Sequence, residues 1–238
     1  MKLLALDSSG MVASVAVLED EVLLAEYTVN YKKTHSQTLL PMLDAASGML
    51  ELDLKTLDAI AVAAGPGSFT GLRIGCATAK GLGLALDKPL ISVPTLEALA
   101  YNLYDTEGLI CPLMDARRNQ VYTGIYAFEQ HKLKVVENQK AIAVAEMIEK
   151  LNERKTPVTF LGDGVPVYRE QLEKGMRVPF SFAPAHLNRQ RASAVAALAA
   201  EYWKQGKTES AREHRPEYLR MSQAERERME RERKKACL

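Results

Sequence analysis

Two short segments carry the residue types that could bind a phosphate group. Residues 7–9 follow an apolar run and combine a carboxylate, which could hold a metal-bound phosphate, with two hydroxyls that could donate to phosphate oxygens. Residues 65–71, GPGSFTG, follow another apolar run and open a helical pattern, where exposed backbone N–H groups favour anions. The sequence therefore makes six residues candidates for nucleotide or anion binding: Asp7, Ser8, Ser9, Gly65, Gly67 and Ser68.

Each segment also has a purely structural explanation. An Asx turn that closes a hairpin accounts for residues 7–9. A sharp strand-to-helix turn, in which glycine lets the backbone pack closely, accounts for residues 65–71. The second segment lacks the Lys-Ser/Thr of a Walker A loop and does not match GxGxxG. The residue types alone leave both explanations open.

Catalytic groups and metal ligands are hard to find elsewhere in the sequence. The four histidines are isolated, with no HxxxH or HExxH spacing, and the three cysteines form no CxxC pair. We therefore predict no catalytic residue and no metal site. Asp115 with Arg117 and Arg118, at the end of a predicted strand, is the remaining polar cluster, and a salt-bridged turn is its simplest explanation.

Composition and charge are those of an ordinary globular protein. The 238 residues are 47% hydrophobic and 26% charged, which allows a sizeable core, and the net charge of +1 gives no strong field for nucleic acid or membrane. Scattered cysteines are typical of free thiols in a reducing compartment. No apolar stretch approaches the roughly 20 residues of a membrane span. We expect a cytoplasmic protein with no membrane partner.

Hydrophobic periodicity predicts alternating strands and helices in two blocks. Strands are expected at 2–6, 13–18, 22–29, 57–64, 88–93, 110–114, 121–128, 135–136 and 158–161, and helices at 35–50, 70–86, 94–104, 143–151, 168–174 and 192–205. This order predicts an α/β protein with two lobes of similar plan.

The two blocks define the expected domain organisation. An N-terminal lobe is expected at 1–106, with the helix at 192–205 packing back on it. A smaller C-terminal lobe is expected at 107–191. Residues 221–238 form a charged tail of alternating sign with almost no apolar face. Its excess of basic residues is a weak indication of RNA binding.

Two of the predicted helices have faces suited to close packing. Gly71, Gly75, Ala79 and Gly83 recur every four residues, so they share one smooth face. The helix at 35–50 offers a stripe of Leu and Met, with Pro41 inside the pattern as a site for a kink or a later start. An intramolecular core is the default explanation for each face, and a seam between subunits is the alternative.

Several segments together resemble the bacterial TsaB family over roughly residues 1–220. They are LALDSS with ASVAVL, KKTHSQTLLPML, AVAAGPGSFTGLRIGCATAKGLGLAL, PLISVPTLEALA, MDARRNQVYTGIY and RPEYLR. The resemblance implies an actin/Hsp70/hexokinase-like fold of two lobes. It also implies a role in making N6-threonylcarbamoyladenosine at position 37 of tRNAs that read ANN codons, where the paralogue TsaD transfers the threonylcarbamoyl group.

One departure from the TsaD pattern implies a role without catalysis. TsaD-like chains carry an HxxxH metal motif after the strand that follows the GPG helix, and here Thr95 and Leu99 stand at the two histidine positions. Leucine cannot ligate a metal and threonine is a poor ligand. The resemblance therefore implies a scaffold that organises TsaD.

The resemblance also implies partners and a docking surface. The expected partners are a TsaD-like paralogue, a TsaE-like ATPase, a second copy of this chain when it is alone, and tRNA indirectly through the complex. No cofactor is expected in the chain itself, with ATP or ADP at the complex interface left open. The alternative is an ATP-binding, kinase-like enzyme of the same fold that uses residues 7–9 and 65–67. The predicted interface residues are His35, Leu39, Leu43, Ala46, Leu50, Leu72, Gly75, Cys76 and Ala79.

Overall fold

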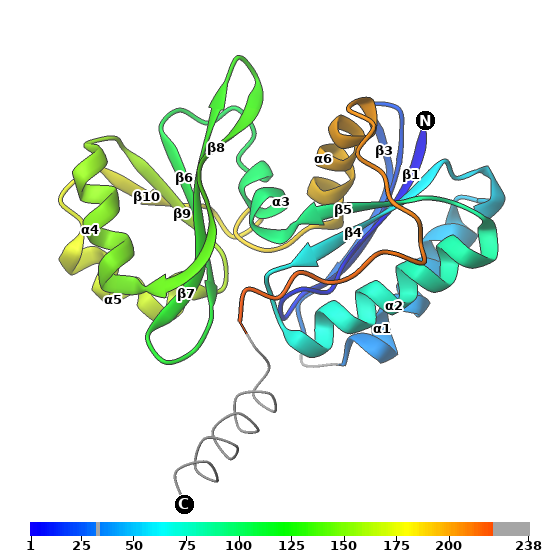
Figure 1. Ribbon diagram of the computed structural model, residues 1–238, viewed down its shortest axis with the longest axis horizontal. Coiled ribbons are helices and arrows are strands. Elements are labelled where there is room, and N and C mark those ends of the chain that lie inside the picture. The colour runs from blue at the N-terminus through cyan, green and yellow to red at the C-terminus, as the bar shows by residue number, and fades with distance from the viewer. Residues whose placement is uncertain (32–33, 221–238) are drawn as a thin grey trace, which may run out of the picture.

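The structure, a computed structural model, describes residues 1–31 and 34–220 and consists of two lobes, each built on a five-stranded sheet (Figure 1). The first sheet contains β1 (Lys2–Asp7), β2 (Ala13–Glu19), β3 (Val22–Val29), β4 (Ala59–Gly65) and β5 (Leu90–Pro94), in the order β3-β2-β1-β4-β5. The second contains β6 (Leu109–Asp115), β7 (Gln120–Glu129), β8 (Lys132–Ala143), β9 (Val158–Leu161) and β10 (Phe180–Phe182), in the order β10-β9-β6-β7-β8.

The two sheets share one topology. In the first, β1, β2 and β3 form an antiparallel meander, and β4 and β5 extend the sheet in parallel on the other side of β1. The second sheet repeats this with β6, β7 and β8 as the meander and β9 and β10 as the parallel extension. Strands β1 and β6 therefore occupy equivalent central positions, and their C-terminal ends carry Asp7 and Asp115.

Helices cover both faces of the first sheet because its central strands are apolar on both sides. Leu4 and Leu6 pack with α1 (His35–Met49) and α2 (Phe69–Leu86), whereas Leu3 and Ala5 pack with α6 (Ala192–Lys204). This alternation follows from the two-residue period of a strand. Helix α6 comes last in the chain and nevertheless packs on the first sheet.

The second lobe places helices on one face of its sheet. Helices α4 (Val144–Arg154) and α5 (Gly164–Gly175) pack against a core that includes Leu113, Val121 and Phe160. The other face meets α3 (Thr95–Tyr101), whose Leu96 and Leu99 lie in one cluster with Ile110 and Tyr126. Helix α3 therefore joins the cores of the two lobes.

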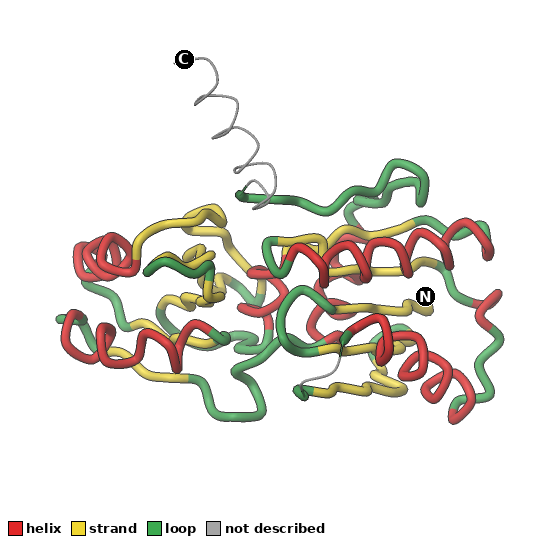
Figure 2. The backbone as a smooth tube through the Cα atoms, turned by 90° about the horizontal axis from the view of Figure 1, so that it is seen from below, coloured by secondary structure: helices red, strands yellow, loops and turns green. Residues whose placement is uncertain are grey.

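Residues 206–220 form an extended C-terminal segment without a helix (Figure 2). It starts after α6, pairs with the edge of the first sheet through a Leu90–Glu209 bridge, and runs beside α2 toward the second lobe. The tail at 221–238, including Cys237, lies outside the described residues.

Most predicted elements occur, and the differences have local causes. Helix α1 runs through Pro41 and begins at His35, with no new start near the proline. Helix α5 begins four residues before the predicted Tyr168. The short strand β10 and the 3-10 turn at Leu54–Thr56 are absent from the prediction, because three residues are too few to show a period. Among the described residues, no helix has the length and apolar character needed to cross a membrane.

Candidate functional site

The turn after β1 is closed by its own carboxylate. Asp7 is buried, and its Oδ1 accepts hydrogen bonds from the backbone N–H of Ser9 at 2.8 Å and from the Ser9 hydroxyl at 2.6 Å. This is the Asx turn of the structural alternative. Burial raises the pKa of Asp7 to about 6, although the two hydrogen bonds from Ser9 act in the opposite direction. The Asp7 carboxylate therefore accepts its hydrogen bonds from within its own turn.

The glycine-rich loop packs directly on that turn. The N–H of Ser68 donates to the Ser9 carbonyl at 2.6 Å, and the Ser8 hydroxyl donates to the Gly71 carbonyl at 2.9 Å. A Cβ at Gly67 would overlap the Ser9 carbonyl, and one at Gly71 would overlap the Ser8 carbonyl. The two segments proposed to cradle a phosphate therefore fill the space between them with each other. These contacts favour the close-packing explanation for both.

The start of α2 is likewise satisfied within the chain. Ser68 is the N-cap residue, and its hydroxyl accepts from the N–H of Gly71 at 3.3 Å. Gly65 donates its N–H to the hydroxyl of buried Thr95 at 3.1 Å, and a Cβ at Gly65 would overlap the carbonyl of Glu217 in the C-terminal segment. Neighbouring segments of the chain thus cover the turn on both sides.

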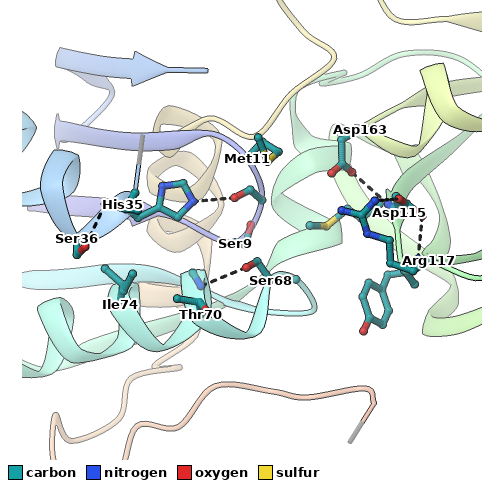
Figure 3. Close-up of a pocket in the computed structure, with 17 residues that line it drawn as sticks. Ser9, Met11, His35, Ser36, Ser68, Thr70, Ile74, Asp115, Arg117 and Asp163 are labelled. Carbon is teal, nitrogen blue, oxygen red and sulfur yellow. Dashed lines mark hydrogen bonds and ion pairs between the residues drawn. The ribbon is translucent and has the colours of Figure 1, made fainter. Parts of the chain in front are cut away.

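A cavity of about 520 Å³ lies between the lobes, next to this packed turn (Figure 3). The first lobe contributes Ser9, Met11 and His35 together with the start of α2, and the second lobe contributes Met114, Asp115, Arg117, Tyr122 and Asp163. Of the six residues predicted to bind a nucleotide or anion, Ser9, Gly67 and Ser68 line it, whereas Asp7, Ser8 and Gly65 do not. The cavity is therefore an interlobe cleft that half of the predicted residues help to form.

Polar groups on the second-lobe wall are largely paired with one another. Asp115 accepts from the N–H of Arg117 at 2.8 Å and from the Tyr168 hydroxyl at 2.9 Å, and its Oδ2 lies 3.3 Å from the Arg117 guanidinium. Arg117, Arg118 and Asn119 all have left-handed backbone conformations, which makes the turn tight. Residues 115–119 are thus the salt-bridged turn expected from the sequence. Asp163 faces the cavity, and burial raises its pKa.

His35 links the start of α1 to the turn after β1. Its Nε2 lies 2.8 Å from the Gly10 carbonyl, and within the described part of the chain its buried Nδ1 has no hydrogen-bond partner. Figure 3 shows the imidazole at the cavity wall, on the side of Ser9 and Met11. The histidine of the predicted interface set therefore lies at the junction between α1 and the cavity.

The structure corrects the choice of side chains for the predicted docking surface. Leu39, Leu43 and Ala46 point from α1 into the first-lobe core, and Leu72 and Ala79 are buried under α2. Gly75 and Cys76 are also buried, and Leu50 is only partly exposed. The apolar stripe that the sequence pattern detects is the side of each helix that covers the sheet.

The solvent side of the same two helices also carries apolar residues, beside the exposed Asp44 and Arg73. Leu40 is 53% exposed, Met49 is 79% exposed and Leu84 is 52% exposed. Small or apolar residues continue this surface, and we call the whole set the outer face: Leu40, Pro41, Ala45, Met49, Ala77, Gly81, Leu84 and Ala85. Sequence reasoning missed it because the inner stripe carries the stronger periodic signal.

The two residues expected at the TsaD metal-motif positions are both buried. Thr95 is buried and bonded to Gly65, and Leu99 is buried in the core that joins the lobes. Within residues 1–31 and 34–220, no group of three or more His, Cys, Asp or Glu side chains is placed to hold a metal ion.

Sequence reasoning did not select several residues that line the cavity. Met11, Ile74, Met114 and Tyr122 are apolar residues within or beside predicted elements, so their types carried no signal. Asp163 had a signal, because it sits between two glycines at the end of a predicted strand. Strands β9 and β4 hold corresponding places in the two sheets. The turn after β9, with Asp163, therefore faces the same cavity as the glycine-rich turn after β4.

Comparison with known proteins gives consistent results. A family profile described as TsaD, tRNA N6-adenosine threonylcarbamoyltransferase, matches residues 22–228. The tRNA threonylcarbamoyladenosine biosynthesis protein TsaB of Bacillus subtilis is 36% identical over 94% of this chain and 96% of its own length. The Escherichia coli protein of the same name is 27% identical over 92% of this chain and 95% of its own length.

Solved structures agree with these matches. YeaZ from Pseudomonas aeruginosa is 28% identical, with a TM-score of 0.76, and covers 92% of this chain and 99% of its own. An activator of 2-hydroxyisocaproyl-CoA dehydratase from Clostridium difficile, solved with ADPNP, shares the fold at 12% identity and a TM-score of 0.50, with 87% of this chain and 97% of its own covered. The predicted actin/Hsp70/hexokinase-like α/β fold is confirmed. Profile, relatives and structures together show that the chain belongs to the TsaB family.

Proposed function

We propose that this protein is a non-catalytic scaffold subunit in the formation of N6-threonylcarbamoyladenosine at position 37 of tRNAs that read ANN codons. In this proposal it acts in the cytoplasm and pairs with a TsaD-like paralogue, which a TsaE-like ATPase joins. It contacts tRNA only through that complex. When alone, it pairs with a second copy of itself. The names of its relatives in Bacillus subtilis and Escherichia coli support the pathway.

The observation that carries the proposal is the outer face of α1 and α2. Several large apolar side chains exposed on a water-facing pair of helices are typical of an interface. The surface is rich in small residues, which allow a second pair of helices to approach closely. Two such faces related by a twofold axis would form a four-helix seam, and a paralogue of the same fold could replace one copy.

The absence of a catalytic role is supported by two positions. Thr95 and Leu99 stand where the TsaD metal motif has histidines. Thr95 is bonded to Gly65 in the first lobe, and Leu99 packs in the core that joins the lobes. Threonine is a poor metal ligand and leucine is none, so we infer that the chain does not hold the metal of the transferase. Its role in the proposal is to position a partner. We infer an inactive paralogue of the transferase.

The proposal includes no cofactor held by the isolated chain and leaves open ATP or ADP at the seam with the partner. The kinase-like alternative has weaker support, because residues 7–9 and 65–71 are bonded to each other. Calorimetric titration of the isolated protein with ATP and Mg²⁺ separates the two ideas. We expect no binding heat, and stoichiometric binding with turnover would favour the enzyme.

Charge on the outer face tests the proposed pairing. Leu40→Glu and Ala77→Glu each place a carboxylate on the exposed side of one helix, so they should abolish co-purification with a TsaD-like partner and leave the fold intact. Val167→Glu is the matched control, because Val167 is 57% exposed on α5 of the second lobe. Wild-type recovery of partner by both outer-face variants would show that the seam lies elsewhere.

A further inference from the structure

We propose that the C-terminal segment 206–220 is a releasable clamp that holds the two lobes together beside the interlobe cavity. The segment is anchored on the first lobe, lies along α2 and ends against the second lobe (Figures 1 and 2). The clamp concerns the lobes of one chain, so it does not depend on which partner the chain binds.

A polar cluster around the buried His214 anchors the start of the clamp. Ser92 of β5 donates to Glu209, and His214 Nδ1 lies 2.8 Å from Glu209 Oε1 and 2.9 Å from Ser92 Oγ. The His214 side chain is fully buried, whereas Ser92 and Glu209 are partly exposed. Breaking this cluster would leave the buried His214 Nδ1 without a partner, which is unfavourable. The anchored end is therefore expected to stay in place.

Backbone and aromatic contacts hold the middle of the clamp on the first lobe. Lys80 of α2 donates to the carbonyls of Arg212 and His214, each at 3.0 Å. Further on, the Tyr218 ring stacks on Phe69 with centroids 4.2 Å apart. The N–H of Glu217 donates to the Ala64 carbonyl at 2.7 Å. The clamp thus covers the glycine-rich turn before it leaves the first lobe.

Among the residues that the structure describes, two side-chain hydrogen bonds connect the end of the clamp to the second lobe. Gln139 of β8 donates to Glu217 Oε2 at 2.9 Å, and the Arg220 guanidinium donates to the Ala116 carbonyl at 2.6 Å. Glu217 is exposed, so its hydrogen bond adds little net free energy, whereas the part-buried bond from the charged Arg220 is the stronger contact. This end is therefore held mainly by one side chain and can detach when that bond breaks, while the anchor remains.

The position of Ala116 connects the clamp to the cavity. Ala116 and Arg117 belong to the β6–β7 turn that lines the cavity from the second lobe. The chain itself crosses between the lobes at residues 102–108 and 183–191, and the buried cluster around α3 also joins them, so the clamp adds a further non-covalent connection. Its release would let the lobes move about the α3 core and widen the cavity, as in hinge motions of two-lobed proteins.

The distance between the lobes tests the clamp. Spin labels are placed at Val22→Cys on β3 and Val167→Cys on α5, both exposed, in a Cys237→Ser background in which Cys76 and Cys111 are buried. We expect Arg220→Ala with Tyr218→Ala to shift the label-to-label distance distribution in pulsed dipolar spectroscopy to longer and broader values. Arg212→Ala, which changes an exposed side chain of the same segment, should leave it unchanged.

Hydrogen exchange provides a second measurement on the same variants. The Glu217 amide, bonded to Ala64, should exchange about five to ten times faster in the double variant, the factor that corresponds to loss of one hydrogen bond. The single variant Arg220→Lys keeps a charged donor at this position, so its distance distribution should lie close to that of the wild type. A wild-type distribution in the folded double variant would overturn the clamp, as would an equal change in Arg212→Ala.

Discussion

Asp7 illustrates how a residue type suited to chemistry can serve structure. Its carboxylate lies under the turn after β1 and accepts both hydrogen bonds from Ser9. The sequence showed the carboxylate and the hydroxyls but not the direction in which they point. Whether such a residue faces a ligand or its own backbone depends on the neighbouring loop, which is distant in sequence.

The buried carboxyl of Asp7 makes a testable contribution to pH dependence. Its pKa in the folded protein is raised from 3.8 to about 6, so the folded state holds the proton more tightly than the unfolded state does. Its contribution to the free energy of unfolding is therefore largest below pH 4 and is lost as the pH rises through 6, by about 3 kcal/mol at most. Asp7→Asn should flatten this slope in urea denaturation at pH 4 to 7.

A matched variant separates this effect from general charge. Asp44 is exposed on α1, and Asp44→Asn should leave the pH dependence of unfolding as it is in the wild type. An unchanged slope for Asp7→Asn would mean that the carboxyl is already solvated in the folded protein.

Glycines in α2 give a prediction that distinguishes packing from helix propensity. Gly71→Ala places a Cβ on the Ser8 carbonyl and should destabilise the protein by roughly 3 kcal/mol. Gly81 lies in the same helix with nothing within 4 Å of its Cβ position, so Gly81→Ala should stabilise by about 0.5–1 kcal/mol. Thermal or urea unfolding measures both. Equal effects would contradict the role of the glycine-rich loop as a packing surface.

Helices α1 and α2 each carry apolar residues on two sides. The inner side covers the first sheet, and the outer side faces solvent. Leu43→Ala should therefore lower the free energy of unfolding by about 3 kcal/mol, because it leaves a cavity in the core. Leu40→Ala on the same helix should change it by less than about 0.5 kcal/mol. Similar losses in denaturation experiments would mean that the outer side is covered within the monomer.

Periodicity explains which elements could be predicted from the sequence. Long helices and strands such as residues 22–29 and 70–86 carry enough repeats to show their period, and they occur close to the expected bounds. The period also marks an apolar side, but it cannot say whether a sheet or a partner covers it. That is why Leu39 and Ala79 were predicted at an interface and are found in the core.

The residues that line the cavity from the second lobe could not be predicted because they depend on how the two lobes meet. Its walls combine Met11 and His35 with Asp115 and Asp163, which lie far apart along the chain. The resemblance to the TsaB family supplied the two-lobed plan, whereas the C-terminal segment that connects the lobes had only a short motif, RPEYLR, and no periodic pattern.

Different surfaces of the whole molecule are proposed to have different tasks. The outer face of α1 and α2 is proposed to hold a partner, and the clamp is proposed to hold the two lobes beside the interlobe cavity. Neither task requires chemistry on this chain, in agreement with Thr95 and Leu99 at the metal-motif positions. The proposed function is therefore that of a scaffold.

Reconstitution of the modification tests this central claim most directly. The assay is run with or without this protein. It combines a TsaD-like transferase, a TsaE-like ATPase and an ANN-reading tRNA with threonine, bicarbonate, ATP and the synthase that makes threonylcarbamoyl-AMP. We expect modified adenosine only when the protein is present. The Thr95→Ala and Val167→Glu variants, added in place of the wild type, should support the modification, and the Leu40→Glu variant should not. Equal yields of modified adenosine with and without the protein would contradict this claim.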